Sequence, residues 1–324
     1  MVAWVWVGLT VLILPLWWRA QWDWHGWSPS RLPALHTLGF AYFYLRLIAW
    51  GVSLSRDPNQ PLRPLDTLCW LIYPPIMRLG PVMLREEFLN RLDSWDPRAA
   101  APWRAIGSRF GLFLLGGVGL AILDKNIPFV FAAGTDFFAD PQRYDTDRLL
   151  RAFYLVPMQI YLLLWTYNEL AATAALWLGI RVDNNFNWLP KAVSLRDFWR
   201  RWHITVGAWL RDFVYIPLGG SRRWAERNIM AVFLFCGLWH GASWSFLAWG
   251  VSQGVGLSIE RWWESLRTRL GWNGLLRSRA WALACWLLTM HYQFATIVVF
   301  VDFQHAGTRF YPELARRVAP FLFA

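Results

Sequence analysis

The sequence predicts an all-α, polytopic membrane protein. Hydrophobic residues make up 56% of the 324-residue chain, and charged residues only 16%. Several segments approach the roughly 20 apolar residues that a helix needs to cross a bilayer. The 26 Trp and 10 Tyr residues suit the lipid headgroup region, where a side chain has one apolar and one wet end. Composition therefore indicates a multi-pass membrane protein.

Six apolar segments are expected to span the membrane. In chain order they are residues 2–18, 34–54, 110–123, 149–180, 229–257 and 280–301. The first has no basic stretch ahead of it and no small-residue cleavage pattern behind it, so we interpret it as a retained span and not as a removed signal peptide. Residues 149–180 exceed one membrane thickness and carry Pro157 early, which predicts a kinked or strongly tilted helix.

Two further apolar segments are interrupted by Pro or Gly. Residues 65–84 contain three prolines, and residues 125–138 contain Pro128 and Gly134. Irregular backbone at membrane depth is tolerated only where protein or water satisfies its polar groups. Both segments are therefore expected to be re-entrant or interfacial. The chain has no internal repeat and no polar block large enough for a soluble domain, so residues 1–324 are predicted to form one membrane domain.

Charge and cysteine spacing disfavour several functional classes. The net charge of +11 reflects 32 Lys and Arg residues against 21 Asp and Glu. Most Arg residues lie beside apolar spans, where they anchor loops and meet anionic lipid, so nucleic-acid binding is disfavoured. The three cysteines have no paired spacing, which indicates neither a disulfide framework nor a metal or redox site.

The segment 194–213 predicts a helix with two different faces. Ser194, followed three residues later by Asp197, resembles a capping box with Asp in place of Glu. Helical spacing gives a cationic row of Arg196, Arg200, His203, Gly207 and Arg211. The aromatic row contains Trp199, Trp202, Val206, Trp209 and Phe213. Such a helix fits the membrane interface or the wall of a funnel into the membrane. The alternative is an anchor whose Arg residues bind lipid phosphate.

His240 lies in an apolar stretch among small residues. Its helical neighbours Cys236, Gly237, Gly241 and Ser243 would let another backbone or a narrow substrate approach closely. An ionisable side chain at membrane depth is costly unless it faces a cavity or a partner, so it is a functional candidate. The alternative is a histidine that is hydrogen-bonded across a helix pair for stability.

A set of short motifs resembles the membrane-bound O-acyltransferase family. The motifs are residues 185–187 (NFN), 198–203 (FWRRWH), 209–212 (WLRD), 215–220 (YIPLGG) and 237–241 (GLWHG). They are most similar to bacterial members that acetylate alginate and other exopolysaccharides, with the teichoic-acid D-alanylation protein as a cousin. The resemblance implies a ring of tilted transmembrane helices, with re-entrant segments, around a central tunnel that donor and acceptor enter from opposite faces.

The resemblance also implies roles for individual residues. His240 corresponds to the histidine regarded as catalytic in the family, and His203 to its usual partner near the tunnel. An imidazole with a pKa near neutrality suits removal of the hydroxyl proton during attack on a thioester, so His240 is the expected general base. Protonated His203 or a Trp N–H group is an expected donor to the oxyanion.

Several motif residues are expected to bind substrate. A guanidinium matches phosphate in a bidentate way, so the phosphate of coenzyme A or of a phosphopantetheine arm is the expected ligand of Arg200, Arg201 and Arg211. Lipid headgroups are the alternative ligand. Trp199, Trp239 and Asn185 are the other expected substrate contacts. No metal site is expected, because the chain has no HExxH motif and no closely spaced ligand set.

The expected function is transfer of an acyl group, acetyl by the resemblance, from a thioester donor to a hydroxyl of a cell-surface or secreted polysaccharide. The donor is acyl-CoA or an acyl carrier protein, without a bound cofactor, and the expected location is the bacterial inner membrane. Expected partners are membrane lipids, the donor, and an extracytoplasmic acetyltransferase or another polysaccharide-machinery subunit. The alternative is a non-catalytic membrane subunit, or docking platform, that passes acyl groups to a separate extracytoplasmic transferase.

The sequence departs from the family pattern in two ways, in the number of preceding spans and in one residue pair. Bacterial relatives commonly begin with additional spans, whereas about one span precedes Leu38 here, so a partner is expected to supply part of the helical ring. Ala171 and Ala172 stand where relatives carry a Ser-Asp pair. Glu169, one of the nearest polar residues, is either a relay carboxylate or a paired structural carboxylate.

Overall fold

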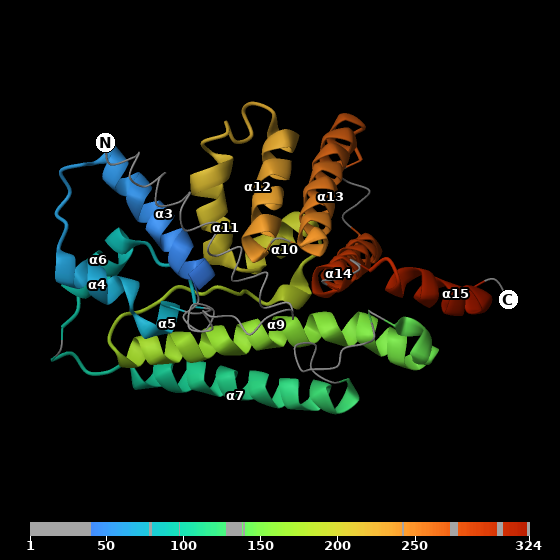
Figure 1. The fold of residues 1–324 in the computed structure, drawn as a ribbon, viewed down its shortest axis with the longest axis horizontal. Helices are drawn as coiled ribbons and strands as arrows, with labels where there is room; N and C mark the ends of the chain where they lie inside the picture. Colours follow the sequence, from blue (N-terminus) through green and yellow to red (C-terminus); the bar gives the residue numbers. More distant parts are fainter. Residues whose placement is uncertain are drawn as a thin grey trace. The chain divides into compact units, whose positions relative to one another are not determined.

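A computed structural model describes residues 40–77, 80–96, 98–127, 138, 140–241, 243–272, 278–302 and 307–322. Within these ranges the chain is helical and has no strand, which confirms the all-α prediction for this part of the chain (Figure 1). The predicted span at residues 2–18 lies outside the described ranges.

The chain packs into two compact units. Unit 1 consists of Met1–Leu115, Leu164–Asn185 and His203–Trp209, and unit 2 of Gly116–Leu163, Phe186–Trp202 and Leu210–Ala324. The single domain over residues 1–324 stays a prediction. In chain order the helices are α3 (Phe40–Arg56), α4 (Pro64–Leu71), α5 (Pro74–Met77), α6 (Arg85–Asp93), α7 (Trp103–Asn126), η1 (Pro141–Arg143), α9 (Thr146–Trp177), η2 (Leu189–Lys191), α10 (Leu195–Arg201), α11 (Ile204–Leu210), η3 (Arg211–Tyr215), α12 (Ala225–His240), α13 (Trp244–Arg269), α14 (Arg279–Val301) and α15 (Phe310–Leu322).

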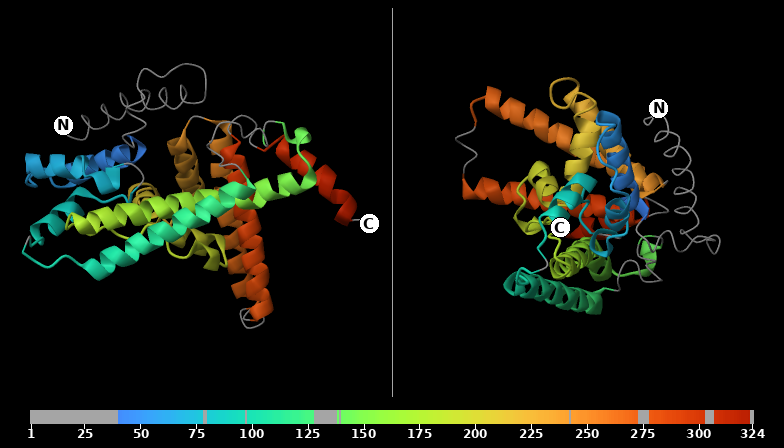
Figure 2. Two further views of the ribbon diagram at one scale, coloured as in Figure 1. Left: turned by 90° about the horizontal axis from the view of Figure 1, so that it is seen from below. Right: turned by 90° about the vertical axis from the view of Figure 1, so that its left-hand side faces the viewer.

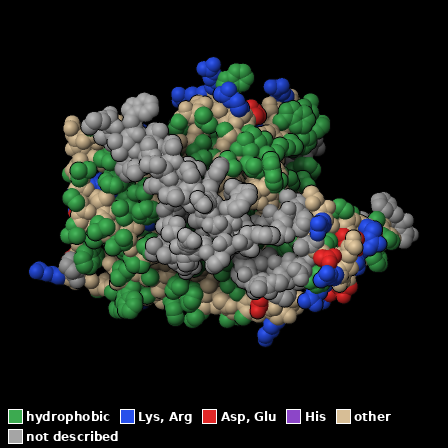
Figure 3. All heavy atoms as spheres, in the orientation of Figure 1, with side chains coloured by type: hydrophobic (Ala, Val, Ile, Leu, Met, Phe, Trp, Pro, Cys, Tyr) green, Lys and Arg blue, Asp and Glu red, His purple; other side chains and the backbone are tan. Residues whose placement is uncertain are grey.

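Three of the described helices, α7, α9 and α14, are long and apolar enough to cross a membrane. They coincide with the predicted spans at 110–123, 149–180 and 280–301 and confirm that these segments form helices of sufficient length, and α9 contains Pro157 as expected. Only 6% of the most apolar 18-residue stretch of α7 is buried. Its large apolar side chains therefore face outward (Figure 3), which suits a helix that contacts lipid. Helices α7 and α9 lie side by side (Figures 1 and 2).

The segment 65–84 is interrupted, as predicted, into α4 and α5. Arg46 of α3 is fully buried, and its guanidinium donates to the carbonyl oxygens of Trp70 (2.9 Å) and Leu71 (3.2 Å) at the end of α4. The last carbonyl groups of a helix have no partner within that helix, so a side-chain donor satisfies them. Arg46 therefore stabilises the broken backbone, a role that the sequence analysis missed.

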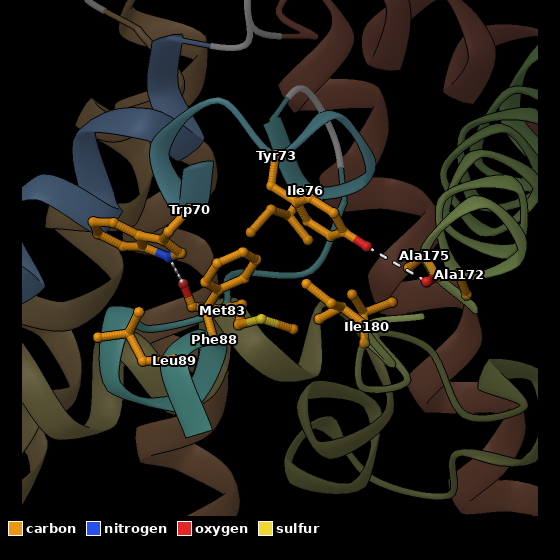
Figure 4. Packing of buried hydrophobic residues seen from close by; sticks show 10 residues of the cluster. Trp70, Tyr73, Ile76, Met83, Phe88, Leu89, Ala172, Ala175 and Ile180 are labelled. Carbon is orange, nitrogen blue, oxygen red and sulfur yellow. Dashed lines mark hydrogen bonds between the residues drawn. The ribbon is translucent and has the colours of Figure 1, made fainter. Parts of the chain in front are cut away.

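The hydrophobic core of unit 1 surrounds this interrupted segment (Figure 4). Trp70 donates from Nε1 to the carbonyl of Met83 (2.9 Å), and Tyr73 donates from Oη to the carbonyl of Ala175 in α9 (3.4 Å). The side chain of Phe88, from α6, packs edge-on against Tyr73 at 5.3 Å. The broken segment is thus held by side chains of unit 1. Most of the other interrupted segment, 125–138, lies outside the described residues.

The prediction of one span over residues 229–257 is wrong. The segment is divided into α12, which ends at His240, and α13, which begins at Trp244. Gly241 follows α12 with φ 148° and ψ 170°, a conformation that is essentially restricted to glycine. The Ser243 side chain caps α13 by accepting from the Ser245 amide. His240 is therefore the last residue of a helix and does not lie within a continuous span.

Two glycines allow α12 and α13 to pack backbone to backbone. A Cβ atom added at Gly237 would overlap the carbonyl oxygen of Phe246, and one added at Gly250 would overlap that of Phe233. The small face that the sequence places beside His240 is thus covered, at Gly237, by the backbone of α13. The sequence analysis expected either another backbone or a narrow substrate to approach this face. At Gly237 the structure contains the backbone of α13.

Gly250→Ala should destabilise the protein, by about 1–3 kcal/mol, because the new methyl group meets backbone atoms that side-chain rotation cannot move away. The measurement is the thermal unfolding midpoint of the purified protein in detergent. Gly111→Ala in α7 is the matched control, since no described atom lies within 4 Å of a Cβ added there. Equal midpoints for the two variants would contradict the close approach of α12 and α13.

Candidate active site

The predicted continuous helix over residues 194–213 is wrong at its centre. Helix α10 begins as expected, with the Ser194 side chain accepting from the Asp197 amide at 3.1 Å. It ends before Trp202, and His203 follows with φ 44° in the left-handed region, which is costly for a residue other than glycine. Helix α11 then starts and continues as the π-helix η3. The expected row from Arg196 to Arg211 is therefore not one helical face.

Asn185 holds the chain at this interruption. Its backbone oxygen accepts from the Ile204 amide at 2.9 Å, and its side-chain Oδ1 accepts from the Thr205 amide at 3.0 Å and from Thr205 Oγ1 at 2.8 Å. Asn185 is 2% exposed, and Thr205 Oγ1 also accepts from the Val82 amide at 2.9 Å. The first amide groups of α11 are thus satisfied by a residue that lies far from them in sequence.

The same side chain fixes the tautomer of His203. Asn185 Nδ2 lies 3.3 Å from His203 Nδ1. Because Asn185 Oδ1 faces an amide that can only donate, the amide orientation is set and Nδ2 must donate to Nδ1. The neutral imidazole then carries its proton on Nε2. His203 lies outside the three apolar helices long enough to span a membrane, and burial lowers its pKa to about 4. His203 is therefore neutral at pH 7, which argues against a protonated oxyanion donor.

His240 lies among aromatic rings of unit 2. Its ring is 4.7 Å from that of Trp239, 5.9 Å from Phe246, 5.5 Å from Trp249 and 4.8 Å from Phe300. The residue is half-buried. The rings come from α12, α13 and α14, and they restrict the directions from which a substrate reaches His240.

Trp199 of α10 belongs to the same aromatic cluster. Its ring lies 5.9 Å from Trp249 and 4.9 Å from Phe233. Trp199 Nε1 donates to Gln253 Oε1 at 3.1 Å. Trp199 and His240 thus both contact Trp249, a residue that the sequence analysis did not select, and Trp239 contacts His240. The nine-residue spacing from His240 to Trp249 crosses the interruption at Gly241, so helical periodicity gave no signal for it.

The three selected arginines differ in what they contact. Arg201 donates from Nε to Asp197 Oδ1 at 2.9 Å and from Nη1 to the Asn187 carbonyl at 3.2 Å. Arg211 pairs with Asp212 at 2.7 Å while its side chain remains 62% exposed, and ion pairs so exposed contribute little. Arg200 is exposed on α10. Arg200 and Arg211 are therefore the more accessible to a phosphate.

The selected residues are distributed over both units. Asn185 and His203 belong to unit 1, and the others, Trp199, Arg200, Arg201, Arg211, Trp239 and His240, belong to unit 2. Within unit 1 the structure brings Asn185 and His203 together, and within unit 2 it brings Trp199, Trp239 and His240 together. The convergence of His203 and His240 on one tunnel stays a prediction.

Glu169 is a paired structural carboxylate. Arg109 of α7 donates to both of its carboxylate oxygens, at 2.9 and 2.8 Å, and also to Asn184. The Glu169 side chain is 8% exposed, so the pair neutralises a buried charge. Of the two roles considered for Glu169, this contact favours the structural one. Arg109 also lines a cavity of about 960 Å³ in unit 1, together with Trp95 and Trp177.

His203 should remain neutral, with its proton on Nε2, at pH 5.5, because its pKa lies near 4. In Asn185→Asp a carboxylate oxygen replaces the Nδ2 donor, so Nδ1 should acquire a proton and the ring should be charged at that pH. Nitrogen-15 NMR of histidine-labelled protein, with His203→Asn for assignment, measures both states. Asn184→Asp is the control that adds the same charge one residue away. A wild-type His203 that is protonated at pH 6.5 would contradict this account.

Comparison with known proteins identifies the family. The sequence model of the membrane-bound O-acyltransferase (MBOAT) family matches residues 4–301. A peptidoglycan O-acetyltransferase of Helicobacter pylori is 43% identical over 208 residues, which cover 61% of this chain and 37% of that protein. The probable alginate O-acetylase AlgI of Azotobacter vinelandii is 43% identical over 232 residues, which cover 69% of this chain and 44% of that protein.

A more distant relative is named for transfer of a different acyl group, D-alanyl in place of acetyl. A teichoic acid D-alanyltransferase of Streptococcus thermophilus is 27% identical over 252 residues, which cover 71% of this chain and 58% of that protein. The chain thus spans less than half the length of the acetyltransferase relatives described above. The family match nevertheless extends over most of the sequence and confirms the resemblance of the motifs. The chain is a membrane protein that belongs to the membrane-bound O-acyltransferase family.

Proposed function

We propose that this protein transfers an acetyl group from a thioester donor to a hydroxyl of a cell-surface or secreted polysaccharide. Relatives named as peptidoglycan or alginate acetyl-transfer enzymes are 28–43% identical, against 25–27% for those named D-alanyltransferases, which supports acetyl over D-alanyl. The observation that carries the proposal is the environment of His240, a half-buried residue at the end of α12 among four aromatic rings.

His240 acts as the general base in this proposal. As the acceptor hydroxyl oxygen attacks the thioester carbonyl carbon, its proton passes to the imidazole. The carbon–sulfur bond then breaks, the imidazolium returns the proton to the leaving thiolate, and an ester and a free thiol are released. The aromatic walls from α13 and α14 limit the access of water, which otherwise competes with the hydroxyl as acceptor.

The donor is coenzyme A thioester or acyl carrier protein, and two exposed cations contact its phosphate. Arg200 and Arg211 have accessible guanidinium groups, whereas Arg201 is held by Asp197 and by the Asn187 carbonyl. Trp199 and Asn185 complete the proposed substrate contacts. No bound cofactor enters the proposal, since a thioester is already activated toward attack.

The proposed setting is the bacterial inner membrane, in a ring of tilted helices around a tunnel on which His203 and His240 converge. A partner completes this arrangement: an extracytoplasmic acetyltransferase or another subunit of the polysaccharide machinery. Membrane lipids contact the outward apolar surface of α7.

His240→Ala should abolish acetyl transfer while membrane insertion is retained, because removal of a general base costs about 10²–10⁴-fold in rate. The measurement is the acetyl content of the polysaccharide in cells whose only copy of the gene is the variant. His291→Ala is the matched control, since that histidine contacts Tyr154 and the Leu287 carbonyl outside the proposed site. Substantial acetylation by the His240 variant would favour a docking platform that passes acyl groups to a separate transferase.

The triple variant Arg200→Gln, Arg201→Gln, Arg211→Gln should bind coenzyme A more weakly, because a lost charge-assisted hydrogen bond costs about 1.5–3 kcal/mol. Calorimetric titration with coenzyme A measures this change. Arg200→Gln alone should show part of the loss without disturbing the Arg201–Asp197 pair. Arg196→Gln is the control on the same helix, since Arg196 pairs with Glu264. Unchanged affinity of the triple variant would leave lipid phosphate as the ligand.

A further inference from the structure

Trp249 carries a buried N–H group without a hydrogen-bond acceptor. The residue is 4% exposed, and no described residue accepts from its Nε1. By contrast, Trp70 donates to the Met83 carbonyl, and Trp286 donates to the Pro190 carbonyl. Buried indole N–H groups usually have a partner, because desolvating an unpaired donor is costly. A donor left unpaired in this way is suited to an acceptor atom that arrives with a substrate.

The Trp249 ring lies directly beside the proposed base. Its centroid is 5.5 Å from that of His240, and the two ring planes are nearly perpendicular, at 87°. Phe300 contacts both rings, at 4.8 Å from His240 and 5.2 Å from Trp249. An acceptor atom that reached the indole N–H would therefore lie in the same aromatic cluster as the imidazole that takes the proton.

Trp249 packs against a tryptophan that belongs to a buried polar network. Trp199 packs on the Trp249 ring and donates to Gln253, one turn further along α13. Gln253 in turn donates to Thr296 Oγ1 at 2.7 Å and exchanges hydrogen bonds with Gln293. A donor fixed in advance by its surroundings needs no reorganisation when charge develops near it. The network thus provides the rigidity that electrostatic stabilisation of a transition state requires.

The chemistry of the proposed reaction requires such a donor. Attack on a thioester moves negative charge onto the carbonyl oxygen, and N–H groups directed at that oxygen stabilise it. His203 is neutral at pH 7 because burial lowers its pKa, so a cationic imidazolium is not its contribution. An indole N–H is a donor only and cannot compete with His240 for the hydroxyl proton.

We propose that Trp249 is a catalytic residue whose Nε1–H donates to the thioester carbonyl oxygen during acyl transfer. This inference rests on the proposed function. The hydroxyl oxygen forms a bond to the carbonyl carbon while His240 removes its proton, and the developing oxyanion accepts from Trp249. When the carbon–sulfur bond breaks, the thiolate takes the proton from His240. Trp249 keeps its own proton throughout.

The first test replaces Trp249 with 3-benzothienylalanine, in which sulfur takes the place of the N–H group without changing the shape of the ring. The value of kcat with acetyl-CoA should fall by about 10²–10³-fold, with KM nearly unchanged. Thermal unfolding should not shift downward, because no internal hydrogen bond is lost. The same substitution at Trp286 is the control, since it removes an N–H bond to Pro190 outside the site and should leave kcat unchanged.

The second test does not depend on turnover. In the His240→Ala background, the infrared stretch of carbon-13-labelled acetyl-CoA should move to lower frequency on binding, and the benzothienyl replacement at Trp249 should reverse this shift. If His240→Ala still transfers acetyl groups, the proposed function fails, and the carbonyl stretch still decides whether Trp249 contacts the donor. If kcat and the carbonyl stretch are both unaffected by the replacement, Trp249 only fills space beside His240 and the inference is overturned. Absence of acetyl-CoA binding would also overturn it.

Discussion

Hydrogen bonding of the backbone at helix interruptions is the constraint on which the rest of this structure depends. In an apolar chain, freed N–H and C=O groups need a partner, and at three interruptions of this chain a side chain supplies it. Arg46 supplies donors at the end of α4, and Asn185 supplies acceptors at the start of α11. Ser243 does the same for α13, after Gly241 has ended α12.

These interruptions determine where both histidines of the site lie. His203 is itself the left-handed residue between α10 and α11, and His240 is the last residue before Gly241. A side chain at such a position projects from a backbone that is fixed on both sides. For His203 the residue that satisfies the backbone, Asn185, also orients the imidazole, so fold and tautomer have the same cause.

Local signals explain which features could be predicted from sequence. The spans around α9 and α14 and the cap at Ser194 depend on neighbouring residues, and each is confirmed. The interruption at His203 was missed because the amphipathic spacing continues across it, and the one at Gly241 because hydrophobicity does, although Gly241 offered a signal. Contacts between distant segments, such as Arg109 with Glu169 or Trp249 with Trp199, depend on tertiary packing that periodicity does not encode.

The Arg109–Glu169 ion pair bears on how the protein is made. Arg109 lies in the apolar helix α7, and its carboxylate partner follows 60 residues later in α9. Arg109 is therefore translated before its carboxylate partner, and its charge has no paired carboxylate until α9 follows. The ion pair forms only once α9 lies beside α7, so the final packing of the earlier helix depends on the later one.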